Sequence, residues 1–313
     1  MHAVAVVLEQ PERLALSRLD LTAPGPADVV VETEWSGIST GTERLLWSGR
    51  MPPFPGLAYP LVPGYEAVGR VVAAGPESAR ATGSFVFVPG ARCFGPVPGL
   101  FGAAASRLVV PGARTVPLDP AVGERGVLLA LGATAWHAIA PPLATLPELI
   151  VGHGVLGRLL ARLVLLHGGA PPVVWETNPT RIAGTIGYRV CTPDDDARRD
   201  YRVICDASGD ATLLDSLIGR LAGGGEIVLA GFYAERLGFA FPPAFMREAR
   251  LRVAAQWQES DMAAVRALID AGRLDLDGLV THRRKAAEAV DAYRTAFADP
   301  ACLKMVIDWR VHA

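Results

Sequence analysis

The sequence has few cysteines and little net charge. Its four cysteines are scattered along 313 residues, and no two form a C-x-x-C pair. Neither a disulfide framework nor a cysteine-rich metal lobe is therefore expected. The formal net charge of −2 gives no electrostatic reason to expect nucleic acid or an anionic membrane as a partner.

Long apolar runs and an export signal are also missing. The longest apolar run, VLGRLLARLVLL, carries two arginines and is too short to cross a bilayer. The opening residues MHAVAVVLEQ are typical of a strand and lack the basic-then-apolar pattern of a signal peptide. We therefore expect a folded, core-forming protein of the reducing cytoplasm, without an integral membrane segment.

The chain has two regions with different sequence patterns. Up to about residue 123, Gly- and Pro-rich turns separate strand-like runs such as VVVETEW and SFVFVPG, which predicts a mostly antiparallel β unit. From 124 to 271, strand-like and helix-like segments alternate, as in ELIVG, VLGRLLARLVLLHG and PVVWE. Such alternation predicts an α/β domain with a doubly wound parallel sheet.

A glycine motif lies at the start of the second region. Gly152, Gly154 and Gly157 form G-H-G-V-L-G between an apolar strand and an amphipathic helix. This context provides a tight turn, close backbone approach to a pyrophosphate, and a helix N-terminus directed at it. The motif therefore predicts dinucleotide binding, with His153 facing the crevice. A glycine turn in a nucleotide-free α/β domain is the alternative.

The choice of dinucleotide depends on the end of the next strand. Glu176 ends PVVWE, near the position where a carboxylate accepts hydrogen bonds from the adenosine ribose and repels a ribose phosphate. This favours NAD, although Arg181 could instead pair with a phosphate or stack on adenine. The later segments CDASGD and LAGGGEIVLAG lie where the ends of the strands should border the nicotinamide. The predicted cofactor-binding residues are Thr134, Gly152, Gly154, Val155, Leu156, Gly157, Glu176, Arg181, Asp206 and Gly231.

Several motifs together resemble the medium-chain dehydrogenase/reductase superfamily. They are the G-x-E-x-x-G run in LVPGYEAVGR, the T-A-x-H-A run in ATAWHA, and the late glycine motif. The resemblance covers essentially the whole chain. It implies a GroES-like catalytic domain at 1–123, completed by 272–313, beside a Rossmann domain at 124–271.

The zinc ligands of that superfamily are missing. Its zinc-bearing members place a cysteine near Ser39, a histidine at Tyr65 and often a cysteine near Ala130. None of these three residues can bind zinc as its counterpart does. The chain therefore resembles a zinc-less branch, and no metal site is predicted.

Longer stretches resemble the dehydrogenases of bacteriochlorophyll synthesis. They include WSGISTGTERLLWSGRMPPFPG, FVPGARCFG and DPACLKMV. The resemblance implies NAD-dependent oxidation of the 3-(1-hydroxyethyl) group of a chlorophyllide-type substrate, a bacteriochlorophyllide a precursor, to 3-acetyl. The alternatives are an NADPH-dependent quinone or enone reductase of the same superfamily, and a nucleotide-binding sensor or scaffold without turnover. A homo-oligomer is also left open.

Oxidising a secondary alcohol requires a hydride acceptor, a group that takes the hydroxyl proton, and a pocket that holds the reacting carbon. The candidate catalytic residues are Ser39, Thr40, Tyr65, Glu66 and His137. Hydroxyls could pass the proton along, and Glu66 could be a base. A buried structural carboxylate is the alternative for Glu66, and a satisfied helix histidine is the alternative for His137.

A large, flat, mostly apolar pigment needs broad apolar and aromatic walls. The first region supplies many such side chains. The candidate pocket residues are Trp35, Trp47, Met51, Phe54, Phe94 and Phe101. Some of them are expected to belong to the core of the domain instead.

Overall fold

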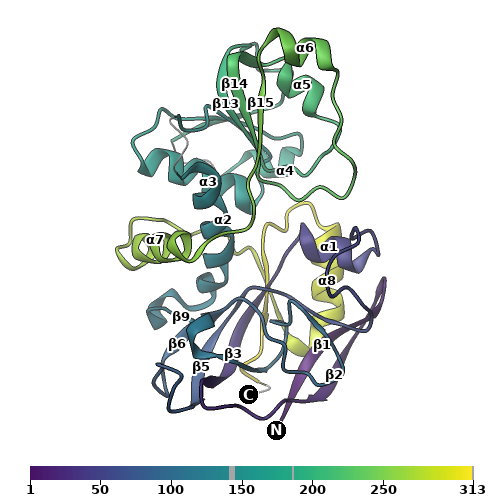
Figure 1. The fold of residues 1–313 in the computed structure, drawn as a ribbon, viewed down its shortest axis with the longest axis vertical. Helices are drawn as coiled ribbons and strands as arrows, with labels where there is room; N and C mark the ends of the chain where they lie inside the picture. The colour runs from purple at the N-terminus through teal and green to yellow at the C-terminus, as the bar shows by residue number, and fades with distance from the viewer. Residues whose placement is uncertain (141–144, 185–186, 312–313) are drawn as a thin grey trace. The chain divides into compact units, whose positions relative to one another are not determined.

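The computed structural model describes residues 1–140, 145–184 and 187–311 (Figure 1). The chain divides into two compact units, one of residues 1–130 with 276–313 and the other of residues 131–275. The C-terminal tail thus belongs to the same unit as the N-terminal region. The two units are described separately below.

The first unit is built on a seven-stranded sheet in the order β16-β17-β3-β5-β6-β9, with β8 pairing with β3. Two short pairs accompany it, β1 with β2 and β4 with β7. The strands are β1 (His2–Gln10), β2 (Arg13–Asp20), β3 (Asp28–Ile38), β4 (Val62–Pro63), β5 (Ala67–Ala74), β6 (Phe85–Val88), β7 (Gly99–Leu100), β8 (Arg107–Pro111), β9 (Val116–Pro117), β16 (His282–Lys285) and β17 (Met305–Asp308). The helical segments are α1 (Thr42–Trp47), η1 (Gly112–Arg114), η2 (Pro120–Leu128), η3 (Ala286–Glu288) and α8 (Ala289–Ala298).

The tail contributes directly to this sheet. Strand β17 pairs antiparallel with β3, and Met305 lies opposite Ile38. Residues just before β17 are therefore brought beside the end of β3, where the predicted catalytic segment begins. Helix α8 packs in the same apolar core as β1 and α1, through residues such as Tyr293, Val6 and Leu46.

The second unit has a six-stranded sheet in the order β12-β11-β10-β13-β14-β15, and every neighbouring pair is parallel. The strands are β10 (Leu149–Val151), β11 (Val173–Trp175), β12 (Arg189–Cys191), β13 (Tyr201–Asp206), β14 (Leu221–Leu229) and β15 (Arg250–Val253). The helices are α2 (Leu129–Ile139), α3 (Val155–Leu166), α4 (Pro179–Ile182), α5 (Leu214–Ile218), α6 (Phe241–Met246) and α7 (Glu259–Asp270). Chain order reverses between β10 and β13, which is where doubly wound sheets bind their ligands. The predicted fold class is confirmed.

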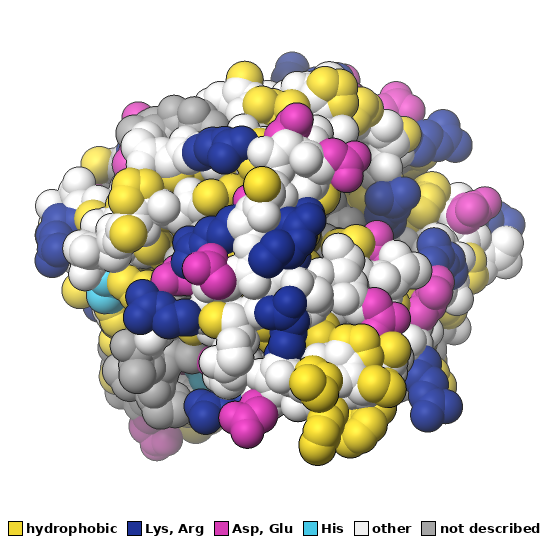
Figure 2. Space-filling view, turned by 90° about the horizontal axis from the view of Figure 1, so that it is seen from above, with side chains coloured by type: hydrophobic (Ala, Val, Ile, Leu, Met, Phe, Trp, Pro, Cys, Tyr) yellow, Lys and Arg dark blue, Asp and Glu magenta, His cyan; other side chains and the backbone are white. Residues whose placement is uncertain are grey.

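The surface is mixed in character. Figure 2 shows a group of apolar side chains among charged ones on one face of the molecule. In the second unit, large apolar side chains of α6, among them Phe241, Phe245 and Met246, are exposed. Within the described ranges, no helix is long and apolar enough to span a bilayer.

Candidate active-site and cofactor residues

Two of the predicted catalytic hydroxyls meet in the first unit. The Tyr65 hydroxyl donates a hydrogen bond to Ser39 Oγ at 2.9 Å, and the backbone N–H of Thr42 donates to the same oxygen at 3.3 Å. Ser39 follows directly after β3 and is buried, whereas Tyr65 precedes β5 and is half-buried. The Thr42 side chain also hydrogen-bonds to Tyr65. The cluster therefore places three hydroxyl-bearing residues around one point.

The phenol of Tyr65 stays protonated at neutral pH. Burial, and after it the nearby charge of Glu66, raises the pKa of Tyr65 well above its ordinary value. Tyrosinate is therefore not available as a base. The phenol can still donate a hydrogen bond and pass a proton to a neighbouring oxygen.

A carboxyl group that sequence reasoning missed lies beneath this cluster. Glu43, in the first turn of α1, is 2% exposed. Its Oε1 accepts from the backbone N–H of Ser39 at 2.9 Å, and its Oε2 accepts from the Tyr293 hydroxyl at 2.7 Å. Burial raises the pKa of Glu43 from 4.5 to about 7. It is thus a buried acid whose charge changes near neutral pH.

The predicted catalytic residue Glu66 is held in a buried ion pair. Lys304 Nζ donates to Glu66 Oε1 at 2.9 Å and Oε2 at 2.7 Å, and also contacts the carbonyl oxygen of Ile38 at 3.3 Å. Gly37 leaves room for this carboxylate, since a Cβ there would lie 2.2 Å from Glu66 Oε2. Burial raises the pKa of Glu66, and Lys304 opposes the rise. This geometry is that of the structural carboxylate, and a catalytic role for Glu66 stays a prediction.

Thr40 and His137 are the other two catalytic candidates. Thr40 lies in the turn before α1 and is half-buried. His137 lies on α2 in the second unit, where its Nδ1 is 2.8 Å from Asp261 Oδ2 at the start of α7. That carboxylate orients the imidazole ring.

The candidate pocket residues fall into two groups. Phe101 packs edge-on to Tyr65, with ring centroids 5.9 Å apart, and Phe54 packs edge-on to Phe101 at 6.0 Å. These rings form an apolar wall beside the Tyr65 ring. Trp47 packs instead on Phe297.

The remaining three candidates are core residues. Phe94 is buried in the apolar cluster between β1, β3 and β8. Met51 is buried in the cluster around α8. Trp35 is buried with the guanidinium of Arg310 4.3 Å from its ring centroid. The sequence could not separate these residues from the wall because both settings favour large apolar side chains.

In the second unit, the glycine run has the geometry that dinucleotide binding requires. Gly152 adopts φ +96°, a backbone conformation that L-residues rarely adopt. A Cβ on Gly154, the N-cap of α3, would meet no atom within 4 Å, so this position is open to a ligand. A Cβ on Gly157 would lie 1.9 Å from the Gly152 carbonyl oxygen, so only glycine lets α3 pack this closely. Val155 and Leu156 are the first two residues of α3.

Glu176 is placed at the edge of this turn. Its Oε2 accepts from the backbone N–H of His153 at 3.2 Å, and its Oε1 accepts from that of Asn178 at 2.8 Å. A carboxylate offers about four acceptor positions, so these two bonds leave capacity for ribose hydroxyls. Arg181 follows within α4.

The expectation that His153 faces the crevice is wrong. Its ring is fully buried, with Nδ1 2.6 Å from the Arg181 carbonyl oxygen and Nε2 2.9 Å from the Tyr188 hydroxyl. Nδ1 must carry the hydrogen, because a carbonyl oxygen only accepts. Burial lowers the pKa of His153 to about 4, so the ring is neutral.

Arg158 hydrogen-bonds to the glycine turn and to the segment after β11. Its guanidinium donates to the carbonyl oxygens of His153, Arg181, Ala183 and Gly184. Together with His153, it ties the segment after β11 to the glycine turn.

The other predicted cofactor-binding residues lie at the ends of the next strands. Asp206 ends β13, and its oxygens accept from the N–H and hydroxyl of Ser208 and from the Tyr233 hydroxyl. The Asp206 carboxylate therefore shapes its own loop. Gly231 follows β14, and a Cβ there would lie 2.8 Å from the Gly209 nitrogen. Thr134 is half-buried on α2.

The residues at the superfamily's zinc positions do not fit zinc. Ser39 Oγ accepts from Tyr65 and from a backbone N–H, Tyr65 keeps its proton, and Ala130 has no donor atom. In the described part of the chain, no group of three or more His, Cys, Asp and Glu side chains could hold a metal ion. No step of the chemistry is therefore assigned to zinc.

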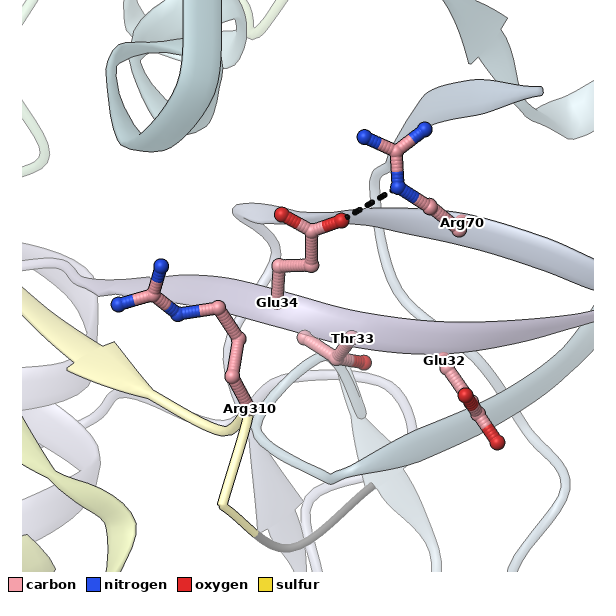
Figure 3. Close-up of a pocket in the computed structure, with 5 residues that line it drawn as sticks. All are labelled: Glu32, Thr33, Glu34, Arg70 and Arg310. Carbon is pink, nitrogen blue, oxygen red and sulfur yellow. Dashed lines mark ion pairs between the residues drawn. The ribbon is translucent and has the colours of Figure 1, made fainter. Parts of the chain in front are cut away.

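A separate pocket in the first unit contains none of the predicted site residues. Figure 3 shows that Glu34 points toward Arg70, which it contacts at 2.9 Å. The other lining residues are Glu32, Thr33 and Arg310. Glu32 pairs with Arg107, and Arg310 pairs with Asp308. The charges around this pocket thus have partners within the protein.

Comparison with known proteins agrees with the fold. Residues 25–120 match the alcohol dehydrogenase GroES-like domain. Two proteins named 2-desacetyl-2-hydroxyethyl bacteriochlorophyllide A dehydrogenase are similar over the full length. The one from Rhodobacter capsulatus is 58% identical and covers 99% of both chains, and the one from Cereibacter sphaeroides is 59% identical and covers 100% of both.

Among solved structures, an Escherichia coli CFT073 protein described as a short chain alcohol dehydrogenase complexed with NADH is similar. Its TM-score is 0.83 at 19% identity, with 98% of this chain and 99% of that chain covered. This identity supports the fold alone. The two relatives that are more than half identical show the family. The chain belongs to the medium-chain dehydrogenase/reductases, in the group of the 2-desacetyl-2-hydroxyethyl bacteriochlorophyllide A dehydrogenases.

Proposed function

We propose that the protein oxidises the ring-A 1-hydroxyethyl group of a bacteriochlorophyllide a precursor to an acetyl group, with NAD as the hydride acceptor. The observation that carries this proposal is the 58–59% identity, over the full length, to relatives named for that substrate. In the reaction, the carbinol carbon gives a hydride to the nicotinamide and the hydroxyl gives up a proton. Alcohol and NAD⁺ thus yield ketone, NADH and H⁺.

The Ser39–Tyr65 pair is suited to the proton part of this reaction. Tyr65 is half-buried, and its ring packs against the wall formed by Phe54 and Phe101; its hydroxyl would hydrogen-bond to the alcohol oxygen. Because Tyr65 stays protonated, we propose that it takes the substrate proton as it passes its own to Ser39 Oγ at 2.9 Å, and that Ser39 at the same time gives up its own hydroxyl proton to water, which carries the released H⁺ to solvent. The aromatic wall would exclude water from this oxygen and favour a broad apolar substrate.

The cofactor would bind at the glycine turn of the second unit. NAD supplies the hydride acceptor when it is bound. Gly152 and Gly154 leave space for the pyrophosphate at the N-terminus of α3. Glu176 would accept hydrogen bonds from the ribose and repel a ribose phosphate, which supports NAD over NADP.

We also propose that the reaction needs no zinc and takes place in the cytoplasm. The first part is supported by the side chains at the zinc positions, which are poor ligands. The second is supported by the four cysteines, which are buried and scattered along the sequence, as is usual for proteins of a reducing compartment. Cell fractionation that found the protein outside the cytoplasm would contradict the second part.

The test is turnover with purified protein. Hydroxyethyl-bearing chlorophyllide pigments with NAD should give the red-shifted absorbance of an acetyl product and an equal amount of NADH. Ethanol and other small alcohols should not react at a comparable rate, because a wide apolar pocket cannot orient them. Tyr65→Phe should lower the rate by about 10²–10⁴, as loss of proton-transfer catalysis does, with NAD affinity unchanged.

Three outcomes would contradict the proposal. Oxidation of small alcohols with the pigments ignored would show that the substrate is wrong. NAD binding without turnover of any carbinol would instead favour a sensor or scaffold, and NADPH-driven quinone reduction would favour the reductase.

A further inference from the structure

We infer that Glu43 is a positioning residue for the alcohol oxidation, and that its carboxylate form holds the Ser39–Tyr65 pair in its working geometry. The inference rests on the proposed function. Glu43 Oε1 accepts a hydrogen bond from the backbone N–H of Ser39. It acts through the backbone of Ser39.

The turn that carries Ser39 is held at successive atoms. Lys304 contacts the carbonyl oxygen of Ile38 at 3.3 Å, Glu43 Oε1 accepts from the N–H of Ser39 at 2.9 Å, and the N–H of Thr42 donates to Ser39 Oγ at 3.3 Å. The direction of the Ser39 side chain is therefore set largely by its own backbone, which Glu43 anchors. Because Tyr65 donates to Ser39 Oγ, the Tyr65 hydroxyl is directed by the same anchor.

The charge of Glu43 matters because both of its partners donate. A backbone N–H can only donate, and the Tyr293 hydroxyl donates to Oε2 at 2.7 Å. A carboxylate accepts both bonds. A proton on Oε2 would face the hydrogen of Tyr293, so that hydroxyl must turn away or the carboxyl must rotate. Rotation would weaken the bond to Ser39, and either change alters the anchor.

The surroundings allow this charge to change near neutral pH. Burial raises the pKa of Glu43 to about 7, and the nearby Glu66 carboxylate adds to the rise. The bonds from Ser39 and Tyr293 and the charge of Lys304 act in the opposite direction. Tyr65 and Tyr293 stay protonated, since burial raises the pKa of each. Glu43 is thus uncharged below about pH 7 and a carboxylate above it.

The test is the pH profile of kcat/KM for the hydroxyethyl pigment. The unmodified enzyme should gain activity as the pH rises through about 7. Glu43→Gln fits the same space but stays neutral. We expect it to lack that rise and to remain about a hundredfold or more below the alkaline activity of the unmodified enzyme, since about a hundredfold is the lower end of the range typical of proton-transfer effects. Glu32→Gln makes the same chemical change at a half-buried carboxylate outside the cluster and should keep the rise unchanged.

Tyr293→Phe gives an independent check. The Tyr293 hydrogen bond lowers the pKa of Glu43, so its removal should shift the rise in activity to higher pH without abolishing it. A merely structural role for Glu43 would not produce this shift.

The outcomes separate the inference from the proposed function. Unmodified enzyme that does not oxidise the pigment contradicts the function. Active enzyme whose Glu43→Gln variant retains the rise at the same pH overturns the inference. NAD affinity and thermal unfolding report whether each variant is folded. If Glu43→Gln does not fold, a rise that stays in place or moves to lower pH in Tyr293→Phe overturns the inference instead.

Discussion

Replacing Lys304 by methionine tests the buried ion pair beneath the hydroxyl cluster. The Lys304 and Glu66 side chains are 2% and 0% exposed, and Nζ contacts both carboxylate oxygens. Lys304→Met keeps most of the side-chain volume but leaves the Glu66 charge without its partner. Removing one member of a buried pair typically costs about 3–5 kcal/mol, so we expect Lys304→Met to lose about that much free energy of unfolding.

The assay is urea unfolding at constant pH, followed by fluorescence. Arg13→Met is the matched control, because Arg13 pairs with Glu9 at side chains that are 69% and 40% exposed, and an exposed pair contributes only about 0–1 kcal/mol. The double variant Lys304→Met/Glu66→Met should recover much of the loss, since an apolar pair replaces the uncompensated charge. A loss under about 1 kcal/mol in Lys304→Met, equal to that of the control, would refute the reasoning.

Three further predictions concern stability and cofactor binding. Folded Glu43 keeps its proton up to about pH 7, while the unfolded chain loses it near 4.5. The free energy of unfolding of the unmodified protein should therefore fall, relative to that of Glu43→Gln, as the pH rises from about 4.5 to about 7. Urea unfolding of both proteins at a series of pH values checks this prediction. Glu176→Ala should weaken NAD binding by about 1.5–3 kcal/mol in calorimetry, and tighter binding of NADP than NAD by the unmodified protein would show the assignment wrong. Arg158→Lys should raise the KM for NAD and leave kcat unchanged, because a lysine cannot reach all four carbonyl oxygens that Arg158 contacts. An unchanged KM would contradict that role.

The sequence predicted the parts of the protein that depend on local pattern. The glycine run, the preceding strand and the following helix are contiguous, so G-H-G-V-L-G could be placed correctly on a turn before α3. The alternation of strands and helices is also visible in contiguous sequence, and it correctly predicted the parallel sheet. The family resemblance placed Ser39 and Tyr65 among the residues of one candidate site, but their hydrogen bond was not predicted, since nothing local relates β3 to the start of β5.

Residues that depend on distant partners could not be found in this way. Glu43 lies in the first turn of a short helix, where an acid is common, and one of its two hydrogen-bond partners is the tail residue Tyr293, 250 positions away. Lys304 carried a faint signal, because Lys285 and Lys304 are the only lysines in a sequence rich in arginine. His153 was misplaced because Tyr188, which fills the other side of its ring, lies beyond the glycine motif.

The measurement that tests the account most directly is the metal dependence of pigment oxidation. Zinc would lower the pKa of the alcohol and hold its oxygen, and we assign those tasks to Tyr65, Ser39 and the Glu43 anchor. Purified protein should contain no stoichiometric metal, and its oxidation of the hydroxyethyl pigment should survive prolonged treatment with a strong chelator. Stoichiometric zinc, with activity lost on its removal and restored on its return, would contradict the account.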